Sequence, residues 1–233
     1  MRTIAIAVLA TLLSLPSQAA ERKPVSQIDT DALASETQPD ATGGDDCISF
    51  VWWIPQEFWA AVLAKDATIT EKDKQSFLGA FKPYSVLAVC QADINAFRMF
   101  KYYSEEVVRK GMTVFLSDET GKRIKITPLA EIPSDTAVVL GRFKPILKSA
   151  MGKLGDNVHF FVLPDKTAAG NRVIDPYLSR TLSVQLSKSD QKLITAQIPL
   201  PLDSLFVPRL CPNGRKAHIS WRFCPWTGVA LDK

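Results

Sequence analysis

The first twenty residues constrain the fold most, because they indicate which part of the chain folds and in which compartment. Arg2 supplies a positive start, and residues 4–15 form an uncharged apolar run that is too short to anchor in a bilayer. Small residues precede the cleavage point, and no cysteine follows the run to carry a lipid. We predict a signal peptide over residues 1–19, cleaved after Ala19 or Ala20, and a periplasmic or secreted product.

Charge divides the rest of the chain into two parts. Residues 20–46 hold seven acidic residues against two basic ones, a net charge of −5, and contain no aromatic residue. The whole chain carries +4, of which Arg2 contributes one, so residues 47–233 carry +8. A segment so poor in apolar residues offers little area to offset its ordering entropy. We therefore predict an acidic flexible leader over residues 20–46 and a single globular domain over residues 47–233.

The most apolar stretch after the signal predicts a strand followed by a helix. It covers residues 48–64, but Pro55 and Glu57 interrupt it, and a charge in the middle of a membrane span costs a few kcal/mol. We predict no membrane span after signal removal. A strand over residues 48–54 and a helix over residues 55–65, which begins on Pro55, fit the pattern better.

Three further helices are predicted by caps and by apolar spacing. Thr70 is placed to cap one helix, with Asp73 three residues later, and Pro83 ends it. A helix over residues 93–110 is expected from its apolar face and its basic last turn, and a short one is expected over residues 145–151.

The remaining apolar runs predict strands, most of them in the second half of the chain. They cover residues 85–90, 112–116, 123–126, 137–140, 158–163, 182–186 and 193–198. We predict an α+β domain with a mixed, largely antiparallel sheet and three or four helices concentrated in the first half. Its β-rich C-terminal half is expected to end in a disulfide-closed, knuckle-like turn.

The chain has four cysteines, which in an exported protein predict two disulfides. Of the three possible connectivities we favour Cys211 with Cys224, because Cys211 begins a turn and the strand after it can return to the same place. A loop of that size constrains the unfolded chain by about 3 kcal/mol. Cys47 would then pair with Cys90, joining the start of the first strand to the end of a central one.

Two segments near the C-terminus, Cys211-Pro-Asn-Gly and Phe223-Cys224-Pro-Trp-Thr-Gly228, resemble the two halves of a zinc ribbon. The resemblance implies knuckle-shaped turns. Each half lacks the second cysteine of the family pattern, and Thr227 stands at one of the two lost positions. A ribbon needs four ligands around its zinc. We predict no metal and no cofactor, and keep zinc bound through Cys211, His218 and Cys224 as the lesser alternative.

Few residues point to catalysis. The chain has two histidines, His159 and His218, and no nucleophile elbow, phosphate loop, His-Glu-x-x-His motif or dinucleotide fingerprint. We assign no catalytic residue. Carboxylates distant in sequence can still meet in space, so a hydrolase acting on a polysaccharide or peptide polymer remains the alternative. Its candidate acids are Glu57, Asp93, Asp165 and Asp175.

The positive domain favours a binding function. Exported basic domains meet anionic polymers and lipid head groups, whereas no nucleic-acid motif is present. We predict a non-enzymatic binding or interaction module whose partner is an anionic envelope component or a protein. Trp226 is the aromatic residue expected to be exposed. The basic clusters are Lys122, Arg123 and Lys125; Arg142, Lys144 and Lys148; and Arg209, Arg215, Lys216 and Arg222.

Overall fold

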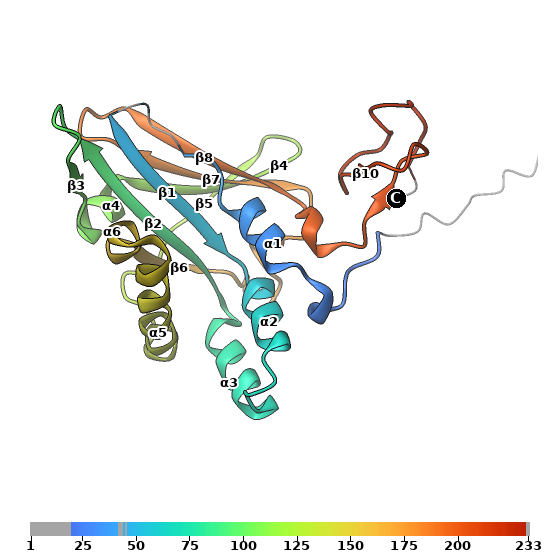
Figure 1. The fold of residues 1–233 in the computed structure, drawn as a ribbon, viewed down its shortest axis with the longest axis horizontal. Helices are drawn as coiled ribbons and strands as arrows, with labels where there is room; N and C mark the ends of the chain where they lie inside the picture. Colours follow the sequence, from blue (N-terminus) through green and yellow to red (C-terminus); the bar gives the residue numbers. More distant parts are fainter. Residues whose placement is uncertain (1–19, 42–43, 45, 232–233) are drawn as a thin grey trace, which may run out of the picture.

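Two four-stranded antiparallel sheets form the body of the protein in the computed structural model, which describes residues 20–41, 44 and 46–231 (Figure 1). In the first sheet, the long strand β2 pairs with the other three, and in the second the order is β5-β4-β7-β8. The strands are β1 (Cys47–Ile54), β2 (Tyr84–Ile94), β3 (Phe100–Tyr102), β4 (Met112–Asp118), β5 (Arg123–Ile126), β6 (His159–Pro164), β7 (Arg180–Ser187) and β8 (Leu193–Leu200). The predicted signal peptide lies outside the described residues.

Six α-helices are present within the described part of the chain, more than the three or four predicted. Figure 1 shows α2, α3 and α5 extending from the sheets as two arms. None of the described helices is both long and apolar enough to cross a membrane. The helices are α1 (Thr30–Thr37), α2 (Gln56–Lys65), α3 (Glu71–Phe81), α4 (Glu105–Gly111), α5 (Ser134–Met151) and α6 (Lys153–Asp156), with 3-10 turns at Val25–Gln27 and Asp203–Leu205.

The core explains why the first sheet is so apolar. Most of β2 and β6 is buried on both faces, whereas β8 buries every second residue only. On one face, Trp52 of β1 packs against Phe58 of α2 and Phe143 of α5, with ring centroids 5.1 and 5.9 Å away. The second sheet covers the other face, so the body has an α+β architecture with one continuous core.

Several predicted elements are confirmed with their local causes. The strand at β1, the helix at α2 and the β4–β5 hairpin lie where the sequence placed them. The Thr70 hydroxyl accepts a hydrogen bond from the backbone NH of Asp73 at 3.2 Å, so it caps α3 as predicted. These segments carry their own start and stop signals, which is why sequence reasoning located them.

Two predicted elements are wrong. Residues 93–110 do not form one helix: β2 continues to Ile94, a tight turn leads into β3, and α4 starts only after its cap Ser104. Residues 137–140 are not a strand but part of α5, which buries Thr136, Leu140 and Leu147 at helical spacing. In both places the short apolar pattern was compatible with a helix and with a strand, and tertiary packing favours the one that was not predicted.

The leader is also different from its prediction, because its described residues are packed onto the body. Asp29 caps α1 by accepting hydrogen bonds from two backbone NH groups. Ile28 and Leu33 are buried in the core, and the Thr37 hydroxyl accepts a hydrogen bond from Trp52 Nε1 at 3.1 Å. The burial of Ile28 and Leu33 and the hydrogen bond from Trp52 stabilise the packed segment in spite of its acidic composition. The segment therefore belongs to the folded domain rather than to a flexible tether.

Candidate functional site

The C-terminal residues 209–231, here called the knuckle, fold into two similar turns that face each other. The backbone NH of Gly214 donates to the carbonyl of Cys211, and that of Gly228 to the carbonyl of Cys224, both at 2.8 Å. Both glycines have positive φ, 78° and 69°, which side chains disfavour. The strands β9 (Arg209–Leu210) and β10 (Lys216–Ala217) join the first turn. The shape agrees with the knuckle turns that the zinc-ribbon resemblance implies.

The turns bring the Cys211 and Cys224 side chains within hydrogen-bonding reach of each other. Desolvation raises the pKa of the Cys211 thiol to about 11. Desolvation also acts on Cys224, but hydrogen bonds from Cys211, from the Thr227 side chain and from backbone NH groups outweigh it and lower its pKa to about 7. Cys211 therefore keeps its proton more readily than Cys224, whose thiolate is favoured by its hydrogen-bond donors.

The four cysteines are free in this structure. Cys211 and Cys224 nevertheless lie side by side, and both are buried with Ala217 in a small core of their own. The predicted disulfide between them stays a prediction.

The second predicted disulfide, between Cys47 and Cys90, does not fit the register of β1 and β2. These strands are neighbours, but Cys47 lies opposite Asp93 and Cys90 lies opposite Phe50. Three residues along a strand span about 10 Å and reverse the face of the side chain. A disulfide needs Cα atoms within about 7 Å, so the register keeps this pair apart.

The knuckle does not assemble the ligands of the zinc alternative. Across residues 20–41, 44 and 46–231, no group of three or more His, Cys, Asp or Glu side chains is arranged to hold a metal ion. The His218 ring instead contacts the Ser220 hydroxyl through Nδ1 at 2.7 Å.

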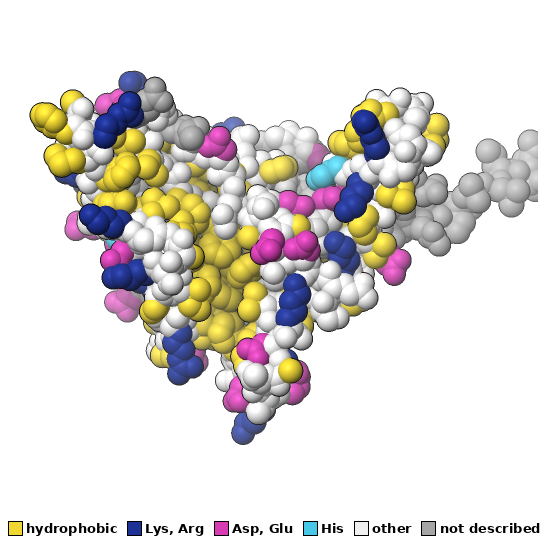
Figure 2. Space-filling model, in the orientation of Figure 1, with side chains coloured by type: hydrophobic (Ala, Val, Ile, Leu, Met, Phe, Trp, Pro, Cys, Tyr) yellow, Lys and Arg dark blue, Asp and Glu magenta, His cyan; other side chains and the backbone are white. Residues whose placement is uncertain are grey.

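The outer surface of the knuckle combines exposed aromatic and basic side chains, and we call it the knuckle face. Trp226, predicted to be exposed, is 46% exposed, and Phe223 is 61% exposed. Trp221 meets Trp226 edge to face at 5.8 Å, and the Arg215 guanidinium lies 4.9 Å from the Trp226 ring centroid. The other members of the face are Leu210, Lys216 and Arg222. Figure 2 shows basic and hydrophobic side chains together on this projecting part of the molecule.

Two of the four candidate acids, Glu57 and Asp165, form ion pairs with the same arginine, Arg172. Arg172 Nη1 lies 2.5 Å from Glu57 Oε1, and its Nε lies 3.3 Å from Asp165 Oδ2. Asp165 is fully buried and also accepts backbone NH groups from Val173 and Ile174. Desolvation lowers the pKa of Arg172, but the two carboxylates outweigh it and raise it. The cluster fastens the loop after β6 to helix α2, which is a structural role that sequence reasoning missed.

The other two acids lie elsewhere. Asp175 accepts the backbone NH of Tyr177 at 2.9 Å. Asp93 accepts the Tyr103 hydroxyl at 2.7 Å, while His159 Nε2 contacts the Tyr103 carbonyl at 2.9 Å, so histidine and acid bind opposite ends of one tyrosine. The structure does not bring the four predicted acids together around His159.

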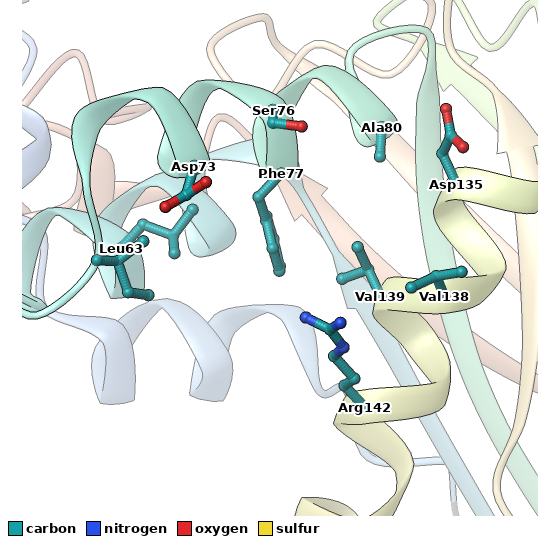
Figure 3. A pocket seen from close by; sticks show the side chains of 10 residues that line it. Leu63, Asp73, Ser76, Phe77, Ala80, Asp135, Val138, Val139 and Arg142 are labelled. Carbon is teal, nitrogen blue, oxygen red and sulfur yellow. The ribbon is translucent and has the colours of Figure 1, made fainter.

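A groove lies between the two helical arms on the face shown in Figure 2, and hydrophobic side chains form its floor. Part of it is a pocket of about 550 Å³ between α3 and α5. Figure 3 shows Phe77 of α3 and Arg142 of α5 pointing toward each other across this pocket, with Val139 beside them and Asp73 farther along α3. Asp73 accepts the Thr70 hydroxyl at 2.6 Å and so belongs to the cap of α3. None of the four predicted acids lines this pocket.

No protein-family model, curated protein or solved structure matches this chain. Function must therefore be argued from the geometry of its own residues.

Proposed function

We propose that the protein is exported and acts by binding, with the knuckle face as its contact surface for an anionic component of the cell envelope. The observation that carries the proposal is the exposed ring pair Trp221–Trp226, with the Arg215 guanidinium over the Trp226 ring. Such rings offer contact area at low entropic cost, and arginine offers two-pronged recognition of carboxylate or phosphate groups.

Charge supports the same proposal. The C-terminal side of the chain carries the excess of positive charge, and the knuckle adds Arg209, Arg215, Lys216 and Arg222 within a short segment. Positive charge gathered on a projecting element increases the rate of encounter with an anionic polymer and makes binding sensitive to salt. Export, through the signal peptide over residues 1–19, would place this surface where such polymers occur.

The disulfide between Cys211 and Cys224 belongs to this proposal. In an oxidising compartment the adjacent thiols would lose two hydrogens to an oxidant of that compartment and form one S–S bond. The bond would hold the two turns, and with them the rings on the knuckle face, in one arrangement.

The test is retention of the purified mature protein on envelope material at low and high salt. We expect retention at low salt that falls steeply at high salt. The variant Arg215→Glu/Arg222→Glu is expected to lose most of it, and Trp226→Ala to weaken it about tenfold, the effect of removing one aromatic anchor.

The matched control makes the same change of charge elsewhere, in the β4–β5 hairpin, as Lys122→Glu/Lys125→Glu. If this control loses binding as fully as the knuckle variant, net charge rather than the knuckle face binds the partner. Progressive loss of the polymer during incubation would overturn the proposal in favour of the hydrolase.

A further inference from the structure

The turn between β2 and β3, residues 95–99, carries Phe97, the most exposed large apolar side chain among the described residues, and Met99 close to it. Phe97 is 83% exposed and Met99 59% exposed, and Phe100 beside them is half exposed. Three neighbouring apolar side chains on one projecting turn form a patch that water does not favour. Figure 1 shows this hairpin at the end of the body farthest from the knuckle.

The turn is held in one shape. The Asn95 side chain accepts backbone NH groups from Phe97 at 2.9 Å and Met99 at 3.0 Å, and the Asn95 NH donates to the Met99 carbonyl at 3.1 Å. Arg98 has a φ of 60°, a left-handed conformation that closes the turn. Because the backbone is satisfied within the turn, the exposed side chains are presented at little further entropic cost.

Basic residues alternate with the apolar ones. Arg98 lies between Phe97 and Met99, and Lys101 follows Phe100. Neither cation has an ion-pair partner among residues 20–41, 44 and 46–231.

Two acids lie near this turn, Asp46 in the same depression as Arg98 and Asp93 opposite Lys101 in the β2–β3 ladder, and both have other partners. The carboxylate of Asp46 binds Lys188 Nζ at 2.7 and 2.8 Å, and Asp93 accepts the Tyr103 hydroxyl. Lys110 lies on the rim of the neighbouring depression and adds a third positive charge. The tip of the hairpin is therefore apolar with a positive collar.

From this arrangement we propose that the β2–β3 hairpin inserts its tip into the surface of an anionic lipid bilayer. A narrow convex tip can enter between lipid head groups. The positive charges of Arg98 and Lys101 around it then lie close to the negative charges of those head groups. The aliphatic parts of the Arg98 and Lys101 side chains can lie in the apolar region beside the Phe97 ring, while their charged ends stay at the level of the head groups. The inference concerns a different surface from the knuckle face, and it holds whether or not the knuckle face binds a polymer.

The experiment is cosedimentation of the mature protein with two kinds of vesicle, one of phosphatidylethanolamine and phosphatidylglycerol, the other of phosphatidylcholine alone. We expect binding to the anionic vesicles and little to the neutral ones. Phe97→Ser/Met99→Ser should lower the apparent affinity by about tenfold or more, because two large apolar side chains lose their burial.

The control variant is Val138→Ser/Ile146→Ser, which removes two apolar side chains of helix α5 that are 59% and 60% exposed. It should bind as the unchanged protein does. Arg98→Glu/Lys101→Glu should weaken binding to the anionic vesicles by at least tenfold, with Lys122→Glu/Lys125→Glu as the charge control.

Insertion itself is read with the variant Phe97→Trp, whose added emission is obtained by difference from the unchanged protein. We expect a blue shift on anionic vesicles and quenching by acyl chains brominated near the head group. Binding without a shift, or equal binding by the Phe97→Ser/Met99→Ser variant, would overturn the proposal. Trp226→Ala should leave this signal unchanged, which separates the result from the function proposed for the knuckle face.

Discussion

The body and the knuckle are stabilised by different means. The body buries a continuous core in which Trp59 stacks on Phe81 at 4.9 Å and meets Phe143 edge to face at 5.0 Å. The knuckle buries only Cys211, Ala217 and Cys224, with Leu231 packed against them. A core of that size cannot balance the entropy of ordering a segment of this length. The difference teaches that the body folds by apolar burial, whereas the knuckle depends on tight turns and on the chemistry of two sulfur atoms.

The largest effect is expected in the body, at the buried ion cluster around Arg172. Arg172→Met leaves Glu57 and Asp165 facing each other without their cation, and breaking such a buried cluster costs about 3 to 5 kcal/mol. Urea unfolding followed by far-UV circular dichroism measures the loss. Arg142→Met, on the exposed surface of α5, is the control and should change stability by less than about 0.5 kcal/mol. A similar small change in the Arg172 variant would show that this cluster contributes little to the body.

A loss of about 3 kcal/mol confined to the knuckle is expected when its cross-link is removed. Intact mass of the oxidised protein should be about 2 Da below the all-thiol value, since one bond removes two hydrogens, and Cys211→Ser/Cys224→Ser should abolish the difference. Hydrogen exchange should then accelerate in residues 209–231 and stay unchanged in the body. Cys90→Ser, in the centre of β2, should instead accelerate hydrogen exchange in the body and leave residues 209–231 unchanged. If Cys211→Ser/Cys224→Ser accelerated hydrogen exchange in the body as well as in the knuckle, the two regions would not be stabilised separately.

The reduced knuckle should titrate near neutrality. The pKa of Cys224 is lowered to about 7, so its thiolate is half formed there, whereas an ordinary cysteine reaches this point about 1.5 pH units higher. A lowered pKa in the folded state stabilises the reduced knuckle above the ordinary thiol pKa, and this contribution disappears as pH falls through about 7. Alkylation rate against pH, read for Cys224 by peptide mass, should have its midpoint near 7. The variant Thr227→Val, which removes one hydrogen bond to the sulfur, should move the midpoint upward; an unmoved midpoint contradicts this cause.

The smallest effect is expected at a surface cap of the body. Thr70→Ala removes the hydroxyl that accepts the Asp73 NH, and such caps contribute about 1 kcal/mol. Thr70→Ser keeps the acceptor and should retain most of the stability in the same urea experiment. Equal losses for both variants would assign the effect to the lost methyl group instead of the cap.

Sequence reasoning located the parts of this fold whose signals are local. The capped helix α3, the strand β1 and the β4–β5 hairpin were predicted because each carries its turn or cap within a few residues. The exposure of Trp226 and the knuckle turns around Cys211 and Cys224 were predicted for the same reason.

What the sequence did not reveal depends on contacts between distant residues. The packing of Leu33 requires a pocket built by other elements, and the register that separates Cys47 from Cys90 is set by the whole of β1 and β2. The ion cluster at Arg172 joins residues 115 positions apart in the chain. Around Phe97, the alternation of apolar and basic residues after Asn95 was a local signal for an exposed turn, but it also fitted a helix.

The packed leader determines the order in which this polypeptide can complete its structure. Lys23 Nζ donates a hydrogen bond to the carbonyl of Ser204, 181 positions later in the chain, and the Glu36 carboxylate accepts from the Ser204 NH and hydroxyl. Arg22 forms an isolated antiparallel β-bridge with Phe206. These three residues therefore find these partners only after nearly all of the chain has left the ribosome. Before that point the segment has only its contacts with α2 and β1, such as the hydrogen bond from Trp52 to Thr37, so its position is completed last.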